Sequence, residues 1–204
     1  MEERGKTEKI KRKSTFREYV EAAAIAVLLA LFIRTFVVQA FKIPSGSMEP
    51  TLQIGDHILV NKFIYGVKIP FIRSTMIPIT RPKRGDVVVF IYPVDRKKDF
   101  IKRVIGLPGD KIEIYDKKIY INDKLYEDEH GDWERPGGRD TLGNHIPFGP
   151  FKVEESRIFV MGDNRNNSYD SRGWGTVPME DIKGKAFIIY WSWGKWNRLL
   201  QLIP

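Results

Sequence analysis

The longest uncharged stretch of the chain lies close to its N-terminus. Residues 22–33 carry only apolar side chains, and with their flanks they form a mostly apolar segment over residues 19–41. About 20 such residues are needed to cross the hydrocarbon core of a bilayer. Two charged residues, Glu21 and Arg34, stand near the ends of this segment, where long side chains can reach toward lipid head groups. The pattern predicts one transmembrane helix over residues 19–41.

After residue 41 the pattern changes to that of strands. Short runs rich in β-branched and aromatic residues recur, separated by glycine, proline and charged residues. Residues 116–118 interrupt two of these runs between Ile114 and Ile121, as the turn of a β-hairpin does. We therefore expect a mainly β domain over residues 42–204, an antiparallel sheet that coils or closes into a barrel. The runs lie at residues 57–60, 86–92, 100–105, 111–115, 118–121, 157–161 and 185–191.

Residues 127–150 break the strand pattern. They are rich in glycine, proline, aspartate and histidine and show no clear periodicity. We interpret them as an insertion that extends from the sheet, because they lack the apolar residues of a separate core. Their Gly137, Gly138 and His145 indicate no particular role.

The position of the positive charge matters more than its amount. A formal net charge of +8 suits nucleic acid and an anionic bilayer equally well. Seven basic residues fall within residues 1–18, directly before the apolar segment, and only Lys42 falls in the first dozen residues after it. The positive-inside rule then predicts that residues 1–18 form a cytoplasmic tail. A cleaved secretory signal ending near Val38 or Ala40 is the alternative, although Arg34 interrupts its apolar region.

Three segments concentrate the polar residues that could carry chemistry, at residues 44–51, 100–104 and 162–175. The first contains serines in a turn-forming context, and a serine needs an adjacent base to attack a carbonyl. Histidine is the usual base, but His57 lies in an apparent strand, and His130 and His145 lie in the insertion. The chain has no cysteine, which excludes thiolate catalysis and cysteine-based zinc sites.

A lysine is the alternative base. Lys102 lies in a strand-like stretch in which Ile101 and Arg103 would share one face and Lys102 would occupy the other. Burial on that face would lower its pKa from about 10.4 and so allow the neutral amine to accept a proton. The pattern alone, however, favours an ordinary solvated lysine.

The third segment is dense in opposite charges. It holds Asp163, Arg165, Asp170 and Arg172 between glycines at both ends. Charges packed so closely suggest mutual salt bridges that fix a rigid turn.

Together these segments resemble those of the bacterial type I signal peptidases. The resemblance covers nearly the whole chain and rests on ordered motifs after the apolar segment. They are residues 44–52 (PSGSMEPTL), 84–90 (RGDVVVF), 101–103 (IKR), 106–110 (GLPGD) and 162–175 (GDNRNNSYDSRGWG). It implies a membrane-bound serine endopeptidase that removes signal peptides from exported preproteins.

The resemblance also assigns roles residue by residue. It implies that Ser47 is the nucleophile and Lys102 the general base, and that the Ser45 side chain and the Ser47 backbone N–H form the oxyanion hole. Ser168 would orient the lysine, and Asp170 and Arg172 would form a structural ion pair beside it. Pockets for small substrate side chains would be lined by Phe41, Ile43, Met48, Leu52, Ile58, Val89, Phe100 and Ile101.

The expected partners follow from the same resemblance: signal peptides and the lipid bilayer, with no nucleic acid, metal or cofactor, and a monomeric enzyme. The resemblance places the protein in the bacterial inner membrane, which the chain would cross once, with the N-terminus in the cytoplasm and the catalytic domain outside. The aromatic residues Trp191, Trp193 and Trp196 could form core or, as in this family, rest on the bilayer. The orientation of Glu49, which follows Met48, is left open.

Two other functions compete with the peptidase. A non-catalytic, membrane-tethered β module would keep the fold and bind a partner without using Ser47 and Lys102. A soluble, self-cleaving, DNA-binding regulator would share a serine–lysine pair but needs an N-terminal helix-turn-helix. An apolar segment behind a basic tail stands at that position instead.

Overall fold

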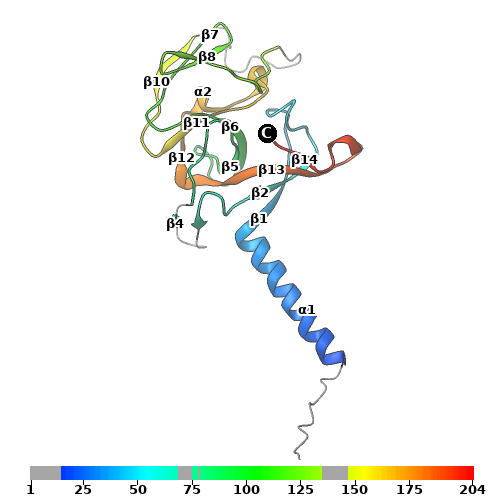
Figure 1. The fold of residues 1–204 in the computed structure, drawn as a ribbon. Helices are drawn as coiled ribbons and strands as arrows, with labels where there is room; N and C mark the ends of the chain where they lie inside the picture. The colour runs from blue at the N-terminus through cyan, green and yellow to red at the C-terminus, as the bar shows by residue number, and fades with distance from the viewer. Residues whose placement is uncertain (1–14, 69–74, 78, 135–146) are drawn as a thin grey trace, which may run out of the picture.

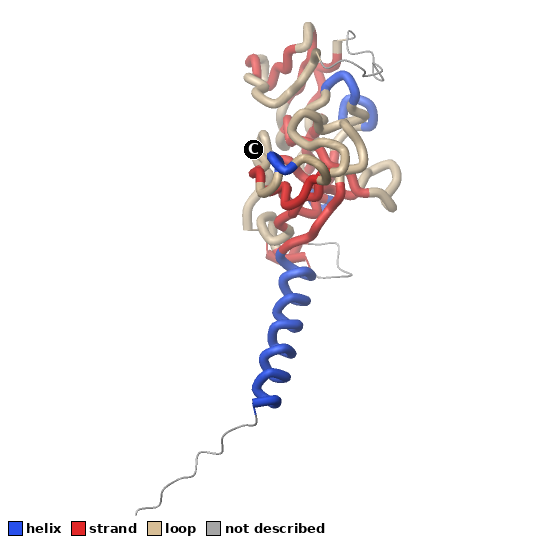
Figure 2. Tube along the Cα trace, turned by 90° about the vertical axis from the view of Figure 1, so that its right-hand side faces the viewer, coloured by secondary structure: helices blue, strands red, loops and turns tan. Residues whose placement is uncertain are grey.

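The computed structural model describes residues 15–68, 75–77, 79–134 and 147–204, and shows a β body with one projecting helix. Helix α1 (Thr15–Phe32) continues as a π-helical turn, η1 (Ile33–Val37), and then joins strand β1 (Val38–Lys42). Figures 1 and 2, at right angles to each other, both show α1 standing away from the sheets. None of its side chains is buried.

The predicted helix over residues 19–41 is wrong at its C-terminal end. The chain leaves the helix after Val37 because Val38–Lys42 pairs with strand β2 (Asp56–Asn61), where Ala40 lies opposite Leu59. Among the residues that the structure describes, no helix is both long enough and apolar enough to span a membrane. Most of the predicted cytoplasmic tail, residues 1–14, lies outside the described residues.

The main sheet is antiparallel, and Lys102 lies in one of its strands. Its strand order is β1-β2-β13-β5-β6-β11-β12, and β14 also pairs with β13. The described strands do not close into a barrel along this path, so the closed form of the predicted sheet is wrong, while the prediction of a mainly antiparallel β domain is confirmed. The remaining strands are β5 (Val87–Ile91), β6 (Asp99–Gly106), β11 (Arg157–Met161), β12 (Val177–Pro178), β13 (Ile182–Ser192) and β14 (Gln201–Leu202).

A second sheet has the order β10-β7-β8-β9 and a third pairs β3 with β4. The predicted hairpin is confirmed, since β7 and β8 pair and Asp116 and Lys117 have φ values of 49° and 58°. Two consecutive positive φ values suit a tight hairpin turn. The strands are β3 (Val67–Lys68), β4 (Thr75–Ile77), β7 (Lys111–Tyr115), β8 (Lys118–Ile121), β9 (Lys124–Tyr126) and β10 (Phe148–Lys152).

The predicted insertion over residues 127–150 is therefore too long. Its end belongs to β10, which pairs with β7 because Phe148 and Phe151 pack on the apolar cluster of the second sheet. Residues 135–146 of the insertion, with Gly137, Gly138 and His145, lie outside the described residues. Short helical elements complete the fold: α2 (Ser171–Trp174) and the 3₁₀ turns η2 (Arg165–Asn167), η3 (Met179–Asp181) and η4 (Trp196–Arg198).

The main sheet buries an apolar cluster on each side of strands β5 and β6. Val87 and Val89 belong to one cluster with Met48 and Leu52, while Val88 and Phe90 belong to the other. This division follows the alternation of side chains along a strand. The segment with Ser47 is thus anchored on the first of these clusters.

Candidate active site

Ser47 lies in a tight turn that precedes a buried apolar anchor. Glu49 N donates to Gly46 O at 3.1 Å, and Leu52 N donates to Met48 O at 2.8 Å. The side chains of Met48 and Leu52 are fully buried, whereas Ser47 is half-buried. The turn therefore holds the Ser47 hydroxyl at the edge of the core.

Lys102, in β6, meets this hydroxyl. Its Nζ donates to Ser47 Oγ at 2.6 Å and to Ile101 O at 3.0 Å, and the residue is only 4% exposed. Burial lowers the pKa of Lys102 to about 8; the charges of Asp170 and Asp163 oppose this shift, and that of Arg172 adds to it. The serine hydroxyl thus faces an amine that loses its proton more readily than an ordinary lysine does.

Residues 162–175 contact the turn that carries Ser47 from the other side. Asn164 N donates to Ser47 O at 3.2 Å, and its Nδ2 donates to Gly46 O at 3.1 Å. A Cβ on Gly162 would lie 2.3 Å from Ser47 O, so only glycine allows this approach. Asn164 was missed from the sequence, although it stands within the charged segment.

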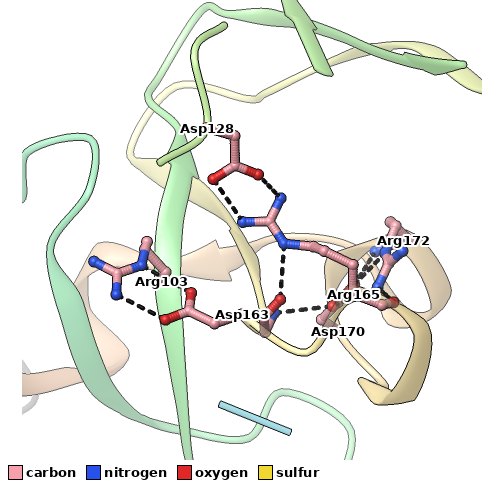
Figure 3. A network of polar contacts seen from close by, with 7 residues as sticks. Arg103, Asp128, Asp163, Arg165, Asp170 and Arg172 are labelled. Atoms are coloured by element: carbon pink, nitrogen blue, oxygen red, sulfur yellow. Dashed lines mark hydrogen bonds and ion pairs between the residues drawn. The ribbon is translucent and has the colours of Figure 1, made fainter. Parts of the chain in front are cut away.

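Asp170 and Arg172 form a buried ion pair beside the lysine (Figure 3), with Arg172 Nε 2.8 Å from Asp170 Oδ1. Gly162 N also donates to Asp170 Oδ2 at 3.0 Å. Burial raises the pKa of Asp170, but Arg172 and the bond from Gly162 outweigh it and hold this pKa below its usual range. The carboxylate therefore stays charged and rigid near Lys102.

The two predicted accessory serines lie differently. Ser168 is buried, but within the described residues its Oγ makes no hydrogen bond to Lys102. Ser45 is exposed on the turn before Ser47. Their roles in orienting the lysine and in the oxyanion hole stay predictions.

Arg103, the neighbour of Lys102, was not predicted as part of the site. Its guanidinium and the Asp163 carboxylate are both fully buried and pair at 2.7 and 2.8 Å (Figure 3). The same guanidinium donates to the backbone oxygens of Gly85 and Pro204 at 2.7 and 3.0 Å. Lys102 and Arg103 are adjacent in β6 but thus have separate environments, because successive side chains of a strand point to opposite faces. This alternation is the sequence signal that could have indicated a separate environment for Arg103.

Seven of the eight predicted pocket residues share one apolar cluster. Phe100 is the exception, because it packs on the opposite cluster and stacks on Tyr92 with ring centroids 4.1 Å apart. The seven are Phe41, Ile43, Met48, Leu52, Ile58, Val89 and Ile101. Alternation along β6 explains the division, since Phe100 lies on the face of Lys102, whose Nζ is 5.6 Å from its ring centroid.

The tryptophans of the C-terminal region are mostly surface. Trp193 is 80% exposed and Trp196 is 71% exposed, and both contact the ring of Trp191. The alternative that all three form core is therefore wrong.

In the described part of the chain, the side chain that hydrogen-bonds the Ser47 hydroxyl is Lys102 and not a histidine. His57 lies in β2 with its ring against Tyr190, and His145 is outside the described residues. Within the described ranges, no group of three histidine, aspartate or glutamate side chains is placed to hold a metal ion.

Comparison with known proteins agrees with this geometry. Residues 16–191 match the family described as signal peptidase, peptidase S26. A signal peptidase I of Pseudomonas fluorescens is 39% identical over 216 residues, covering 91% of this chain and 76% of the relative. A signal peptidase I of Aquifex aeolicus is 36% identical over 228 residues, covering 86% and 84%.

A solved signal peptidase I from Enterococcus faecalis V583 is 29% identical and covers 52% of this chain and 97% of its own, with a TM-score of 0.41. The match of residues 16–191 includes α1 from its second residue, the turn that carries Ser47, β6 and the charged segment 162–175. The chain therefore belongs to the signal peptidase family, peptidase S26, and is a serine peptidase.

Proposed function

We propose that this protein removes N-terminal signal peptides from exported preproteins, with Ser47 as nucleophile and Lys102 as general base. The observation that carries the proposal is the 2.6 Å contact between Lys102 Nζ and Ser47 Oγ at a lysine whose pKa is lowered to about 8. The activity of the relatives named signal peptidase I supports the choice of substrate.

In the acylation step, neutral Lys102 accepts the Ser47 hydroxyl proton while Oγ attacks the carbonyl carbon before the cleavage point. The carbonyl oxygen becomes an oxyanion, for which the Ser47 N–H and the Ser45 hydroxyl are the proposed donors. When the intermediate collapses, Lys102 gives its proton to the departing amine of the mature protein. The signal peptide is left as an ester on Ser47.

In the second half, Lys102 is neutral again and takes a proton from water as that water attacks the ester carbon. Collapse releases the signal peptide as a carboxylic acid, and the proton returns to Ser47 Oγ. The Asp170–Arg172 pair and Ser168 would keep the lysine amine in place through both halves. One base thus serves both steps, and no cofactor is required.

The apolar cluster beneath the turn that carries Ser47, which we call the nucleophile turn, supports a preference for substrates with small side chains before the cleavage point. Ile43, Met48 and Val89 are buried members of this cluster, so a substrate side chain placed against them would meet closely packed apolar walls. Such apolar walls exclude large side chains but discriminate weakly among small ones.

Membrane attachment through α1 is part of the same proposal. Its apolar side chains, among them Leu28 and Phe32, are more than half exposed, so a lipid environment would cover them. The basic residues before it favour a cytoplasmic N-terminus, with the β body across the membrane.

The decisive experiment is processing of a purified preprotein by the wild type, Ser47→Ala and Lys102→Met, with folding checked by circular dichroism. We expect both variants to fold and to leave the preprotein uncut, whereas Ser45→Ala should retain reduced cleavage. Full cleavage by Ser47→Ala would end the proposal. A wild type that cuts nothing and is not acylated by a β-lactam-type inhibitor would favour the non-catalytic binding module.

The topology can be tested because the chain contains no native cysteine. Single-cysteine variants Lys6→Cys and Lys118→Cys would be treated with a membrane-impermeant maleimide in spheroplasts. We expect Lys118→Cys to react in intact spheroplasts and Lys6→Cys only after lysis. The reverse pattern would overturn the proposed orientation.

A further inference from the structure

The segment Asp128–Glu134, which we name the bridging loop, follows β9 and lies directly against residues 162–167. It is the described start of the predicted insertion, for which the sequence indicated no role. Figure 3 shows Asp128 on a strip of chain that approaches Arg165 from the side opposite the Asp170–Arg172 pair. Three sets of contacts join this loop to residues 162–172, and the first of them continues to Ser47.

The first set consists of backbone hydrogen bonds. Asp132 N donates to Asp163 O at 2.7 Å, and Arg165 N donates to Asp132 O at 3.0 Å. These two bonds flank Asn164, which pairs with Asp132 in a parallel bridge. Asn164 then uses its own N–H and its amide nitrogen to hold the carbonyls of Ser47 and Gly46. One edge of this short segment therefore binds the bridging loop, and the other binds the nucleophile turn.

The second set is the ion pair between Asp128 and Arg165. The Asp128 carboxylate accepts hydrogen bonds from both terminal nitrogens of Arg165, one of them at 3.1 Å, and Arg165 is fully buried. Arg165 Nε in turn donates to Gly162 O at 2.9 Å. A Cβ on Gly131 would lie 2.1 Å from Asp128 Oδ2 and 2.7 Å from Arg165 Cζ, so glycine lets the loop close over the pair.

The third set is made by the aromatic side chain of Trp133. The Trp133 ring lies beneath two guanidinium groups, 5.8 Å from Arg165 Cζ and 5.7 Å from Arg172 Cζ. Its backbone oxygen also accepts a hydrogen bond from Asn166 Nδ2. Both arginines of the charged segment thus rest on one indole, in the geometry of a cation–π contact.

We infer that the bridging loop positions the nucleophile, with Asp128 and Trp133 acting as positioning residues for Ser47 through Asn164. A misplacement of a reacting group by about 1 Å costs about 100-fold in rate. The turn that carries Ser47 is partly exposed, and Asn164 holds two of its consecutive carbonyls, those of Gly46 and Ser47. This inference rests on the proposed role of Ser47.

The test compares Asp128→Asn and Trp133→Leu with the control Glu134→Gln. Glu134 belongs to the same loop, but its side chain is exposed and contacts Lys117 on the surface. Cleavage of a purified preprotein and the rate of Ser47 acylation by a β-lactam-type inhibitor would be measured, with thermal unfolding recorded for each variant. We expect the first two variants to lose about 10- to 100-fold in kcat and in acylation rate while KM changes by less than about twofold. Glu134→Gln should match the wild type.

A double-mutant cycle identifies the route. If the loop acts through Asn164, Asp128→Asn combined with Asn164→Ala should be no slower than Asn164→Ala alone. If Asp128→Asn does not fold, Trp133→Leu, which leaves every charge in place, provides the same cycle. Folded variants with unchanged kcat, or fully additive losses, would overturn the inference. A wild type that neither cleaves nor is acylated would instead refute the proposed function itself.

Discussion

Replacement of Lys102 by methionine should abolish cleavage and, at neutral pH, make the fold more stable. Methionine keeps a similar length and removes a buried amine that the folded protein holds in an unfavourable environment. The two effects come from one cause, because burial that makes the lysine a usable base also penalises its protonated form. A catalytic role therefore predicts opposite signs for activity and stability.

The magnitude follows from the pKa of Lys102, which falls from 10.5 to about 8 in the folded protein. Each unit corresponds to about 1.4 kcal/mol, so the protonated form is penalised by about 3 kcal/mol. Between pH 8 and 10.5 the unfolded chain binds the proton more readily, so the free energy of unfolding of the wild type rises with pH. Below pH 8 both states are protonated and the full penalty is present.

Methionine escapes this penalty but loses the hydrogen bonds to Ser47 and Ile101, each worth about 1 kcal/mol. The variant should thus be about 1 kcal/mol more stable than the wild type below pH 8 and about 2 kcal/mol less stable above pH 10. The change of about 3 kcal/mol between these limits is the quantity to measure.

Urea unfolding of both proteins from pH 6.5 to 10.5 gives this difference, and kcat/KM of the wild type over the same range gives the titration of the base. Activity should rise about tenfold per pH unit below 8 and level off above it. Lys118→Met, at an exposed position of β8, is the matched control and should change neither curve.

Three results would refute the reasoning. One is a kcat/KM that does not change between pH 6.5 and 9. Another is a stability difference between wild type and Lys102→Met that is independent of pH. Retention of activity by Lys102→Arg would be the third, because a guanidinium does not lose its proton in this range.

Other substitutions test neighbouring features. Asp163→Asn leaves the buried Arg103 guanidinium without its carboxylate and should lower the free energy of unfolding by about 3–5 kcal/mol, measured by urea denaturation; a loss below about 1 kcal/mol would contradict the importance of this pair. Gly162→Ala places a methyl group against Ser47 O and should abolish preprotein cleavage; normal activity would show that the turn can move. Trp193→Ser should change stability by less than about 0.5 kcal/mol but weaken binding of the β body to lipid vesicles, and unchanged binding would exclude this contact.

Strands of the main and second sheets were predictable where local pattern decided them. Runs rich in apolar residues indicated β5 and β6, in which consecutive residues are buried, and alternation indicated β7 and β13, in which buried and partly buried positions largely alternate. Strand β1 was taken for the end of a helix, since its apolar residues do not alternate with polar ones and only its pairing with β2 fixes it as a strand. Strand β10 was hidden by glycine and proline within the run FGPFK.

The resemblance named Ser47 and Lys102, which the structure places in contact, but the environment of these residues was not predictable from the sequence. The residue pattern left Lys102 as an ordinary lysine, because burial depends on which distant segments cover its face of β6. Arg103 and Asp163 illustrate the same limit, since 60 positions separate them in the chain and they meet at 2.7 Å. The contacts of Asp128 with Arg165 were also beyond the sequence, which shows a charge of each sign but not their pairing.

The pairing of β5 with β6 sets Lys102 opposite Val88 and Arg103 opposite Val87. A slip of one residue in this register would exchange the two cations, bringing a guanidinium to the serine and the amine to the carboxylate of Asp163. The guanidinium could not accept a proton from the serine. The same slip would also exchange the apolar residues of β6 between the two clusters, so the register that packs the core is the register that places the amine at Ser47. The alignment of two strands thus decides whether an amine or a guanidinium faces Ser47.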